Sequence, residues 1–508
     1  MALLLGACST LPTDVERPES HALNNTEGTT LGRLAARLDP GDGKTAYVDM
    51  SDGLDAFLMR TDLIDAAERS LDVQYYVIED NLTGMRFLER LLAAAERGVR
   101  VRLLVDDIGT GGHDRTLVAL DAHPSIELRL FNPFALRSTR LFDFIASGGR
   151  VNRRMHNKSF NADNQVAIVG GRNIGDQYFE ADSEVAFGDF DVVLFGPAVR
   201  QLGDAFDAYW NSEVVLPASA LIEEPATAEE VERLGNALRE HATSMRDSPY
   251  SGRGRKANQI EQLRDGQRKL YRGTATIAYD LPKKVKDDPD ERATHLGPRL
   301  RPIVENAKSE VVIINPYFVP QSQGVEFFVA LRKRGVRVKV LTNSLASTDV
   351  PAVHSGYHRY REDLLRAGVE LFEVRPKVSK AGRKLRRERG GHDLPQSLSL
   401  HAKVFTVDRR YLFVGSMNLD PRSARINTEM GVLIDDPVGA TETAVEFARE
   451  IRKIAYEVKL EQTDGGAQMV WLESTPEGEK RHLSEPEAGF WLHFQVFFLS
   501  LLPVEDQL

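Results

Sequence analysis

The sequence predicts an α/β protein of two duplicated domains, each a mixed β-sheet flanked by helices, packed as a pseudo-twofold pair. Strand, helix and strand follow one another in both halves, RGVRV occurs at 97–101 and 334–338, and a His-Lys-Asp pattern occurs at 156–163 and 401–408. The offsets between the copies are similar, 334 − 97 = 237 and 401 − 156 = 245. Similar offsets indicate that a whole domain is repeated, with small insertions between the landmarks.

The first half contains a β-α-β unit. Residues 69–80 (RSLDVQYYVIED) have the β-branched and aromatic composition of a buried strand, and residues 99–107 (VRVRLLVDD) predict the next strand. Between them, residues 85–98 predict a helix that ends at Gly98, a residue type favoured just after a helix C-terminus. Apolar side chains share one face of this helix: Phe87, Leu88, Leu91, Leu92 and Ala95.

The second half repeats this order of elements. Residues 309–320 predict a strand, 325–335 a helix and 336–344 a strand. An earlier pair of strands, at 45–50 and 274–280, extends the match to the beginning of each half. We therefore expect the duplication to cover each domain from its first strand onwards.

The remaining segments connect or follow the two copies. The residues between them are rich in Glu, Arg and Ala, which favours helix, and the C-terminal tail has no counterpart in the first half. We expect five parts: a lipobox-like N-terminus and tether at 1–30, a first domain at 31–215, a helical linker at 216–268, a second domain at 269–460, and a tail with an amphipathic membrane-interface helix at 461–508.

Length and composition limit the classes of function. With 508 residues the chain is long enough for two or three domains, and its 42% hydrophobic and 28% charged residues are typical of a globular protein. The formal net charge of −10 argues against a general nucleic-acid binder, which would usually be basic. Attraction for phosphate must therefore come from local clusters of basic residues.

The N-terminus resembles the lipobox of bacterial lipoproteins. LLLGAC places apolar and then small residues before Cys8, the single cysteine of the chain, which makes Cys8 a candidate for lipidation. Residues 9–30 are polar and turn-rich, as a tether requires. No basic region precedes the apolar run, which is short for a signal, and a start codon assigned too late would explain both features. The alternative interpretation is a chance apolar start.

Two segments suggest contact with a membrane, although none contains the roughly 18 consecutive apolar residues needed to span it. The segment FWLHFQVFFLSLL at 490–502 is interrupted by polar residues, and its length and aromatic content favour an interfacial helix. The alternative is a C-terminal core helix. The segment at 377–389 carries seven basic residues and one Glu, 7 − 1 = +6, and either attracts anionic headgroups or is a solvated loop.

The duplicated motif pairs two kinds of chemical group. Because side chains alternate along a strand, His156 and Lys158 point to one face, and so do His401 and Lys403. Each copy thus presents an imidazole beside an ammonium. A single copy has a nucleophile or an acid but not both, whereas two copies brought together would supply both.

The register of the repeat holds beyond the motif. Downstream of each histidine, a pair of small residues follows a strand, an Asn lies at +17 and a Glu lies at +28. Small residues permit close approach of substrate. The amides can donate hydrogen bonds to phosphate, and the carboxylates can orient a histidine. The matching positions are Gly170–Gly171 with Gly415–Ser416, Asn173 with Asn418, and Glu184 with Glu429.

The acidic residue that ends each motif has a different expected role. Asp163 and Asp408 lie an odd number of positions from the His and the Lys, so we expect them to be structural, closing a turn or the contact between domains. A metal centre that used His156, Asp163 and Glu184 is the alternative. The ammonium of Lys158 beside these residues disfavours a bound cation.

These groups form a complete phosphoryl-transfer site when both copies face one phosphate. One imidazole attacks phosphorus to form a phosphohistidine, and the other protonates the leaving oxygen and then deprotonates the incoming alcohol or water. Lys158 and Lys403, with the two Asn amides, neutralise and bind the phosphoryl oxygens, so no metal or cofactor is required. Each Glu can hold the histidine of its own or the opposite copy. Of the two histidines we favour His156 as the nucleophile.

These residues resemble the duplicated HxKxxxxD motif of the phospholipase D superfamily, over most of residues 31–460. Several further segments are similar to the bacterial cardiolipin synthases, especially their C-type branch. They include RGVRVRLLVDD, RRMHNKSF, VGGRNIGDQYF, SLHAKVF, SMNLDPRS, NTEMG and the ending FFLSLLPVE.

The resemblance implies a phosphatidyltransferase. His156 or His401 would carry a phosphatidyl group and pass it to phosphatidylglycerol to make cardiolipin, with phosphatidylethanolamine as the donor. It also implies a membrane-associated protein of the bacterial cell envelope, peripheral or lipid-anchored, at the inner membrane and facing the periplasm. The lipobox-like start is not part of the branch's catalytic pattern.

Three alternatives remain from the sequence. The same catalytic core serves phospholipases that hydrolyse lipids, and nucleases. The acidic net charge and the aromatic tail argue against nucleic acid as a partner. A catalytically idle lipid-binding scaffold is the third, and the intact set of duplicated residues argues against it.

Overall fold

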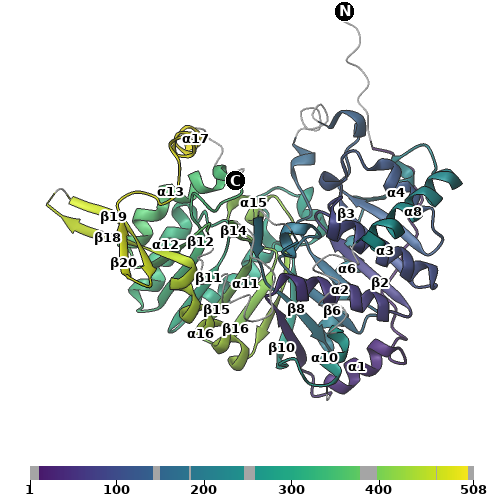
Figure 1. The fold of residues 1–508 in the computed structure, drawn as a ribbon, viewed down its shortest axis with the longest axis horizontal. Coiled ribbons are helices and arrows are strands. Elements are labelled where there is room, and N and C mark those ends of the chain that lie inside the picture. The colour runs from purple at the N-terminus through teal and green to yellow at the C-terminus, as the bar shows by residue number, and fades with distance from the viewer. Residues whose placement is uncertain are drawn as a thin grey trace, which may run out of the picture.

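A series of paired strands runs through both halves of the protein in the computed structural model (Figure 1). The structure describes residues 11–39, 41–140, 149–181, 185–244, 258–377, 397–464 and 466–500. The strands of the first half are β1 (Thr45–Met50), β2 (Ser70–Tyr75), β3 (Arg100–Asp106), β4 (Ile126–Phe131), β5 (Ser159–Ala162), β6 (Val166–Gly170), β7 (Val185–Gly188), β8 (Asp191–Phe195) and β9 (Val215–Pro217). Those of the second half are β10 (Tyr271–Tyr279), β11 (Glu310–Ile314), β12 (Arg337–Asn343), β13 (Glu370–Val374), β14 (Ser397–Leu400), β15 (Lys403–Val407), β16 (Tyr411–Gly415), β17 (Met430–Asp435), β18 (Ala455–Thr463), β19 (Gly466–Thr475) and β20 (Gly478–His482).

The order of the strands is symmetrical about the pair β1–β10. In the first half the pairing runs β9-β4-β3-β2-β5-β6-β8-β1, and in the second it runs β10-β17-β16-β15-β11-β12-β13-β18, followed by β19 and β20. Both sheets are mixed, because β2-β3-β4 and β11-β12-β13 are parallel and the other pairs are antiparallel. The predicted duplication of a mixed α/β domain is confirmed.

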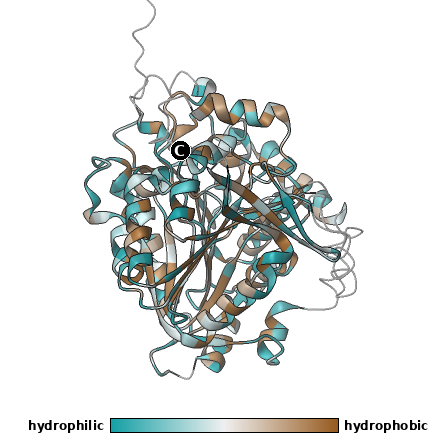
Figure 2. Ribbon diagram, turned by 90° about the vertical axis from the view of Figure 1, so that its left-hand side faces the viewer, coloured by the Kyte–Doolittle hydropathy of each residue, from teal (hydrophilic) through white to brown (hydrophobic). Residues whose placement is uncertain are grey.

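Helices flank the sheet in both halves (Figure 1). The first half and the linker contain α1 (Thr30–Leu38), α2 (Gly53–Ala66), α3 (Leu82–Glu96), α4 (Asp114–Asp121), α6 (Pro197–Trp210), α7 (Ala218–Leu221), α8 (Ala228–Ser244) and α10 (Gln259–Arg264). The second half contains α11 (Leu296–Glu305), α12 (Gln321–Lys333), α13 (Pro351–Arg366), α15 (Pro421–Arg425), α16 (Pro437–Ile454) and α17 (Phe490–Ser500). Figure 2 shows apolar residues in brown along the inner strands, whereas many helices are apolar on one side and polar on the other.

Local sequence explains why the β-α-β units form where they do. The side chain of Asn81 accepts a hydrogen bond from the backbone of Gly84 and caps the first turn of α3. Gly98 follows the helix with φ +88°, and Gly335 follows α12 with φ +83°, a conformation that glycine adopts without strain. The predicted apolar face of α3 packs inwards, with Phe87, Leu91 and Ala95 buried and Leu88 and Leu92 partly buried.

The two halves share one apolar core and a line of backbone pairing. β1 pairs with β10 in antiparallel register, with Tyr47 opposite Tyr271, and the Tyr47 hydroxyl donates to Asp436 at 2.8 Å. Buried side chains from β6 and β8 pack with those from β16 and β17 in this core: Ala167, Val169, Val192 and Leu194 with Leu412, Val414, Val432 and Ile434. Because burying apolar surface is the main stabilising term in folding, the halves form one packed body.

The segment expected to be a tether is held against the first half. The carbonyl of Ser20 accepts from Arg102 at 2.7 Å, and that of Pro18 accepts from Arg129 at 2.8 Å. Both arginine side chains are buried, so they need these acceptors. From Pro18 onwards the segment is therefore part of the first half, which sequence composition did not indicate. Cys8 lies outside the described residues.

The tail extends the second half beyond the duplicated unit. β18 pairs with β13 as β9 pairs with β4, and β19 and β20 then add two antiparallel strands. Glu485, just before α17, is buried and bonds Arg361 of α13 at 2.5 Å. This ion pair fixes the start of the C-terminal helix, which lies against α13 at the upper left of Figure 1.

Candidate active site

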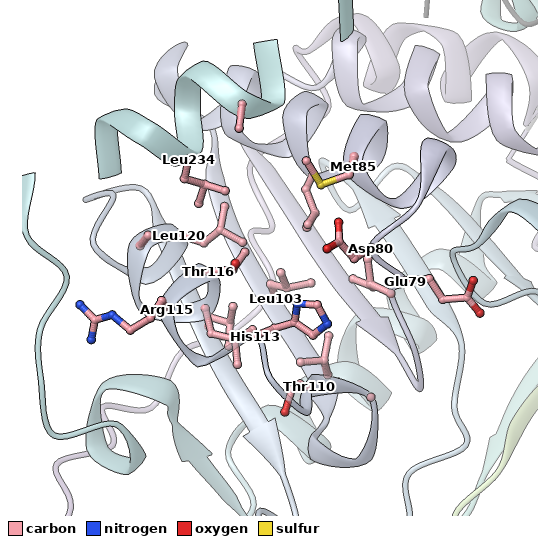
Figure 3. Close-up of a pocket in the computed structure, with 18 of the residues that line it drawn as sticks. Glu79, Asp80, Met85, Leu103, Thr110, His113, Arg115, Thr116, Leu120 and Leu234 are labelled. Atoms are coloured by element: carbon pink, nitrogen blue, oxygen red, sulfur yellow. The ribbon is translucent and has the colours of Figure 1, made fainter. Parts of the chain in front are cut away.

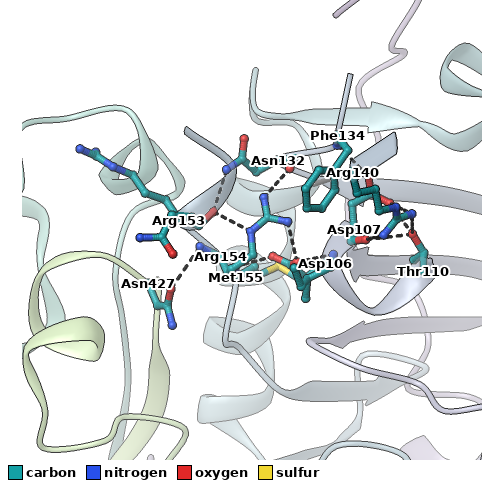
Figure 4. A network of polar contacts seen from close by, with 12 residues as sticks. Asp106, Asp107, Thr110, Asn132, Phe134, Arg140, Arg153, Arg154, Met155 and Asn427 are labelled. Carbon is teal, nitrogen blue, oxygen red and sulfur yellow. Dashed lines mark hydrogen bonds and ion pairs between the residues drawn. The ribbon is translucent and has the colours of Figure 1, made fainter. Parts of the chain in front are cut away.

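The backbone before His156 is fixed by a buried carboxylate at the end of β3. Asp106 accepts hydrogen bonds from the backbone of Met155 at 2.6 Å and from the side chain of Arg154 at 3.0 Å (Figure 4). The backbone of Arg154 also donates to the side chain of Asn427 from the second half, at 3.2 Å. This network holds the segment before β5, which carries His156, between β3 and the other half of the protein.

Each motif histidine is then bound to the backbone of the opposite half. The His156 N–H donates to the carbonyl of Thr428 at 2.9 Å, and the His401 N–H donates to the carbonyl of Gly188 at 2.8 Å. In the second case the contact continues a parallel pair, β7 with β14. Each of these carbonyls belongs to the residue just before an acidic residue, Glu429 or Asp189. The two halves therefore make equivalent backbone contacts with each other.

Those two carboxylates hold the imidazole rings. His156 Nδ1 lies 3.0 Å from each carboxylate oxygen of Glu429, and His401 Nδ1 lies 2.6 Å from Asp189 Oδ2. All four side chains are buried. Because each carboxylate accepts a hydrogen bond from Nδ1–H, the tautomer with a lone pair on Nε2 is favoured, and Nε2 is the atom available for chemistry.

Asp189 was missed by the sequence analysis, and its position has a structural explanation. Gly170 pairs with Asp191 and Gly415 pairs with Gly431, so Asp189 occupies the place in β-register that Glu429 has in the second half. The steps from the histidines are 189 − 156 = 33 and 429 − 401 = 28, so the first half carries five extra residues here.

A landmark in the sequence could have revealed this insertion. Pro197 and Pro437 each begin a helix after equivalent strands, β8 and β17, and their offset is 437 − 197 = 240 rather than the 245 of the histidines. The repeat therefore loses five positions between the motif and these prolines. Glu184, which equal steps had selected, lies outside the described residues.

The two lysines lie with the two histidines in one site. Lys158 Nζ donates to the carbonyl of His156 at 2.6 Å, and Lys403 Nζ donates to that of His401. Burial lowers the pKa of Lys158 well below its usual value, and Lys403 lowers it further. Burial also lowers the pKa of Lys403 to about 8, although Asp189 and Glu429 favour its charged form. Each lysine is thus influenced by groups from both halves.

The histidines are also shifted by their surroundings. Burial lowers the pKa of His156 well below its usual value, and Lys158, Lys403 and His401 lower it further. Burial and Lys403 lower the pKa of His401, whereas the bond to Asp189 acts in the opposite direction. Burial therefore favours the neutral imidazole at His156, as a nucleophile requires, whereas the bond to Asp189 opposes this effect at His401.

The supporting carboxylates differ in charge. Burial raises the pKa of Glu429 to about 7, against the opposing effect of Lys158 and of hydrogen bonds from Ser416 and Ser423. Burial alone would raise the pKa of Asp189 too, but His401 and the neighbouring cations hold it well below its usual value. Asp189 is ionised at pH 7, while Glu429 is close to its midpoint.

The predicted asparagines lie near other residues of the site: Asn173 bonds Tyr178, and Asn418 lines a cavity with Lys403. Asn173 and Asn418 are buried, and the side-chain Oδ1 of each has no hydrogen-bond partner among the described residues. Asn173 Nδ2 donates to the Tyr178 hydroxyl at 2.9 Å, and the Tyr178 ring packs edge-on against His401 at 5.1 Å. Buried amide groups without a partner are costly, which indicates that a ligand group completes them.

Aromatic rings pack against both histidines. Tyr76 packs edge-on against His156 with ring centres 5.1 Å apart, and Phe187 stacks on His401 with centres 5.3 Å apart. These rings reduce the access of water to Nε2, a condition that favours transfer to another acceptor over hydrolysis.

The motif aspartates lie at turns. Asp163 and Asp408 have φ of +52° and +53°. The side chain of Asp163 accepts hydrogen bonds from the backbone N–H groups that lead into β2, at residues 68–70, and Asp408 does the same for β11 at residues 308–310. Each closes a turn within its own half rather than a contact between halves.

Other expected features are described only in part. Among the described residues, no group of three His, Cys, Asp or Glu side chains is arranged to hold a metal ion, and no helix is long and apolar enough to cross a bilayer. Of the basic segment at 377–389, the structure describes Lys377 alone, which pairs with Glu487 at 3.2 Å.

The C-terminal helix combines two interpretations of its sequence. Val496 is buried, and α17 lies on α13, as a docked helix would. The other side exposes aromatic rings, with Phe490 and Trp491 at 75% and 77% exposure. Further exposed rings on this helix are Phe494, Phe497 and Phe498. An aromatic surface of this kind suits a membrane interface.

Comparison with known proteins agrees with the duplicated architecture. The family described as "Cardiolipin synthase, PLD-like domain" matches residues 61–210 and 300–454, once in each half. Cardiolipin synthase C of Escherichia coli (strain K12) is 39% identical over 479 residues, which cover 94% of this chain and 99% of that protein. Cardiolipin synthase of Halalkalibacterium halodurans is 24% identical over 427 residues, covering 83% of this chain and 69% of that protein.

A solved structure shows a similar fold. The crystal structure of phosphatidylserine synthase from Haemophilus influenzae Rd KW20 aligns with a TM-score of 0.54 at 14% identity, and covers 84% of this chain and 92% of that one.

Proposed function

This chain belongs to the family of cardiolipin synthases with phospholipase D-like domains, and we propose that it makes cardiolipin by transferring a phosphatidyl group to phosphatidylglycerol, with phosphatidylethanolamine as the donor. It is an enzyme of the phospholipase D-type phosphatidyltransferase kind, acting on phospholipids. The observation that carries the proposal is the pair of buried histidines, each bonded to a carboxylate of the opposite half and each beside a lysine.

The reaction proceeds in two balanced steps. In the first, the neutral Nε2 of one histidine attacks the donor phosphorus, a P–N bond forms and the P–O bond to ethanolamine breaks. The second histidine enters this step as an imidazolium and gives its Nε2 proton to the leaving oxygen. In the second, that histidine takes the proton of a phosphatidylglycerol hydroxyl. The hydroxyl oxygen attacks phosphorus and the P–N bond breaks, which restores both imidazoles.

The difference between the two histidines supports His156 as the nucleophile. Its pKa is lowered well below the usual value, so its ring stays neutral while it attacks. His401 is bonded to the ionised Asp189 at 2.6 Å, and a fixed negative charge stabilises the imidazolium that an acid must form. We therefore assign the acid and base role to His401.

The lysines and asparagines stabilise the phosphoryl group. Lys158 and Lys403 supply positive charge in a site from which water is largely excluded, where charge interactions are stronger than in water. A bound phosphate would raise both lysine pKa values by favouring the ammonium form. The Nδ2 groups of Asn173 and Asn418 are the proposed donors to the phosphate oxygens, since each amide NH₂ has two hydrogens to donate.

The protein acts at a membrane surface. Its substrates are concentrated there, and the exposed aromatic rings of α17 fit the interface between headgroups and acyl chains. We place it in the bacterial cell envelope, at the inner membrane and facing the periplasm.

The test is transfer of label between lipids. Purified protein in vesicles of phosphatidylethanolamine and phosphatidylglycerol, with the phosphatidyl group of the former labelled, should produce labelled cardiolipin. Removal of phosphatidylglycerol should slow turnover. Label found in phosphatidic acid alone would make the protein a phospholipase, and no turnover of either lipid would contradict the proposal.

A further inference from the structure

The second half contains a large apolar cavity beside the candidate active site. It has a volume of about 670 Å³ and lies between α11, α12 and the face of the sheet formed by β11, β15 and β16. A volume of this size lies within the range of roughly 300–1,000 Å³ that is usual for small-molecule sites. Its apolar lining includes Leu300, Val304, Ile313, Phe318, Phe405 and Phe413.

One end of the cavity is formed by residues of the candidate site. Lys403 and Asn418 line it together with the apolar side chains. Lys403 and Phe405 lie two apart on β15, so both side chains stand on the face of the sheet that lines the cavity. A molecule whose phosphate is bound by Lys403 could therefore extend an apolar chain directly into this space.

The equivalent space in the first half is occupied by a buried charged cluster. Arg60 donates to the Tyr75 hydroxyl at 3.0 Å and to Asp191 at 2.8 Å, and Arg172 lies 3.2 Å from Asp191. These four side chains are buried. They are packed around the same sheet face that carries Lys158.

The second half replaces three of these groups with small or neutral ones. Asp163 and Asp408 cap equivalent strands, which places Asn315 where the first half has Tyr75. Gly431 takes the place of Asp191 in the β-register, and Met417, like Arg172, lies 16 residues after its histidine, since 417 − 401 = 172 − 156. The loss of this cluster leaves the space beside Lys403 open, with an apolar lining on the sheet face.

We propose that this cavity binds an acyl chain of a phospholipid substrate while its phosphodiester or hydroxyl group reacts. The inference rests on the proposed function, because only a lipid substrate joins a phosphate to long apolar chains. Apolar surface that faces solvent is unfavourable, and an acyl chain would cover it at the point where the glycerol backbone meets Lys403. The chain belongs either to the donor or to the acceptor, and the two sources can be separated.

Filling the cavity provides the first test. A Cβ built on Gly297, in the first turn of α11, would lie 3.5 Å from Met417 Cε, an ordinary contact. Gly297→Ala is therefore the matched control, and Gly297→Phe fills the space. Val304→Trp fills it from another position on the same helix, in case Gly297→Phe does not fold.

A second control uses the first half. The cavity between α3, α4 and α8 in Figure 3 has a volume of about 470 Å³ and an apolar floor that includes Leu103 and Leu120. Tyr76 and Asp106 line it, whereas His156, Lys158 and Asn173 are not among the described residues that do so. Ala237→Phe on α8 narrows this cavity without touching the proposed acyl site.

The expected result is a loss that depends on chain length. With dioleoyl lipids, Gly297→Phe should lower kcat/KM roughly tenfold or more, because a pocket rejects groups that no longer fit. With dibutyryl lipids the rate should match wild type, and Gly297→Ala and Ala237→Phe should match wild type with both. Shortening the chains of only the donor or only the acceptor shows which lipid uses the cavity. An equal loss with short and long chains, or no loss with long chains, overturns the inference.

A crosslinking test does not depend on turnover. Phosphatidylethanolamine and phosphatidylglycerol that carry a diazirine near the end of one acyl chain should label peptides from residues 296–328 or 403–419 after illumination, and Gly297→Phe should remove this label. Transfer without such labelling would contradict the acyl site alone. Labelling without transfer by the wild-type protein would contradict the proposed function alone.

Discussion

The two histidine–carboxylate pairs have the same backbone frame and different electrostatics. His401 meets Asp189 through one contact of 2.6 Å, and His156 meets both oxygens of Glu429 at 3.0 Å. Glu429 also accepts hydrogen bonds from two serine hydroxyls, of Ser416 at 2.5 Å and Ser423 at 2.7 Å. Asp189 keeps its charge, whereas burial raises the pKa of Glu429 to about 7.

This difference shows how the two copies of a duplicated domain can acquire different catalytic roles. Duplication alone gives two equal histidines, and phosphoryl transfer needs one nucleophile and one proton carrier. A carboxylate one methylene shorter, after an insertion of five residues, gives one histidine a permanent negative partner. If the two pairs differ in function as they do in charge, equivalent variants in the two halves should behave differently.

The largest effects are expected from removal of the histidines. His156→Ala and His401→Ala should each lower transfer by about 10³-fold or more, because one loses the nucleophile and the other the acid and base. Rates of cardiolipin formation measure this. Normal melting temperatures would show that the loss is chemical.

A donor with a good leaving group should separate the two variants. A phosphatidyl ester of p-nitrophenol needs no acid for its departure, so His401→Ala should still release one equivalent of p-nitrophenol and accumulate a phosphatidyl-histidine detectable by mass spectrometry. His156→Ala should do neither. The reverse pattern would exchange the two roles, and near-normal transfer by either variant would contradict a shared site.

Neutral carboxamides should reveal the difference between the carboxylates. Asp189→Asn should lower kcat by about 10³-fold, because an amide no longer stabilises the imidazolium or its tautomer. Glu429→Gln should cost only roughly tenfold at pH 7, since Glu429 is already half protonated there. Steady-state values of kcat at pH 7 for Asp189→Asn and Glu429→Gln measure this difference. Equal losses would mean that both histidines depend on a charged partner.

The pH profile should contain two limbs, one from Glu429 and one from Lys403. Below pH 7, protonation of Glu429 removes the charge that supports His156, so kcat/KM should rise with pH through about 7. Above pH 8, Lys403 loses its proton and its positive charge, so kcat/KM should fall. Glu429→Gln should flatten the acidic limb, and Lys403→Arg, whose side chain stays charged, should remove the alkaline limb. A limb that is unchanged in its variant would assign it to another group.

The sequence predicted the parts of this protein that repeat. The β-α-β units, the turn at Gly98 and the grouping of His156, Lys158, His401 and Lys403 follow from hydrophobic periodicity and from equal spacing. These signals are local or are read by comparison of one half with the other. The structure confirms the duplicated fold for this reason.

What breaks the repeat could not be predicted from equal spacing. The insertion before Asp189 shifted the carboxylate by five positions, so the expected residue was Glu184. The exchange of Tyr75 and Asp191 for Asn315 and Gly431 left no periodic signal either, because a cavity depends on how distant elements pack. The insertion and the exchanged side chains both lie where the two halves differ in proposed function.

The smallest expected effect concerns the tail, which the second half alone carries. Trp491 and Phe494 on α17 are 77% and 52% exposed, so they contribute little to the folded core. Replacing both with Asp should weaken binding to vesicles of phosphatidylethanolamine and phosphatidylglycerol by roughly threefold to tenfold, because aromatic rings would no longer enter the interface. Activity on these vesicles should fall by a similar factor, as measured by sedimentation and by cardiolipin formation.

A change in folding would have a different signature from a change in membrane contact. Val496→Asp, on the side of α17 that is buried against the protein, serves as the matched control and should lower the melting temperature, because it buries an unpaired charge. Trp491→Asp with Phe494→Asp should leave the melting temperature and the rate on soluble dibutyryl lipids unchanged. If the exposed pair lowers the melting temperature as much as Val496→Asp does, α17 is a structural helix throughout. In that case the tail would stabilise the second half without contacting the membrane. The functional difference between the halves would then lie in their two histidine–carboxylate pairs alone.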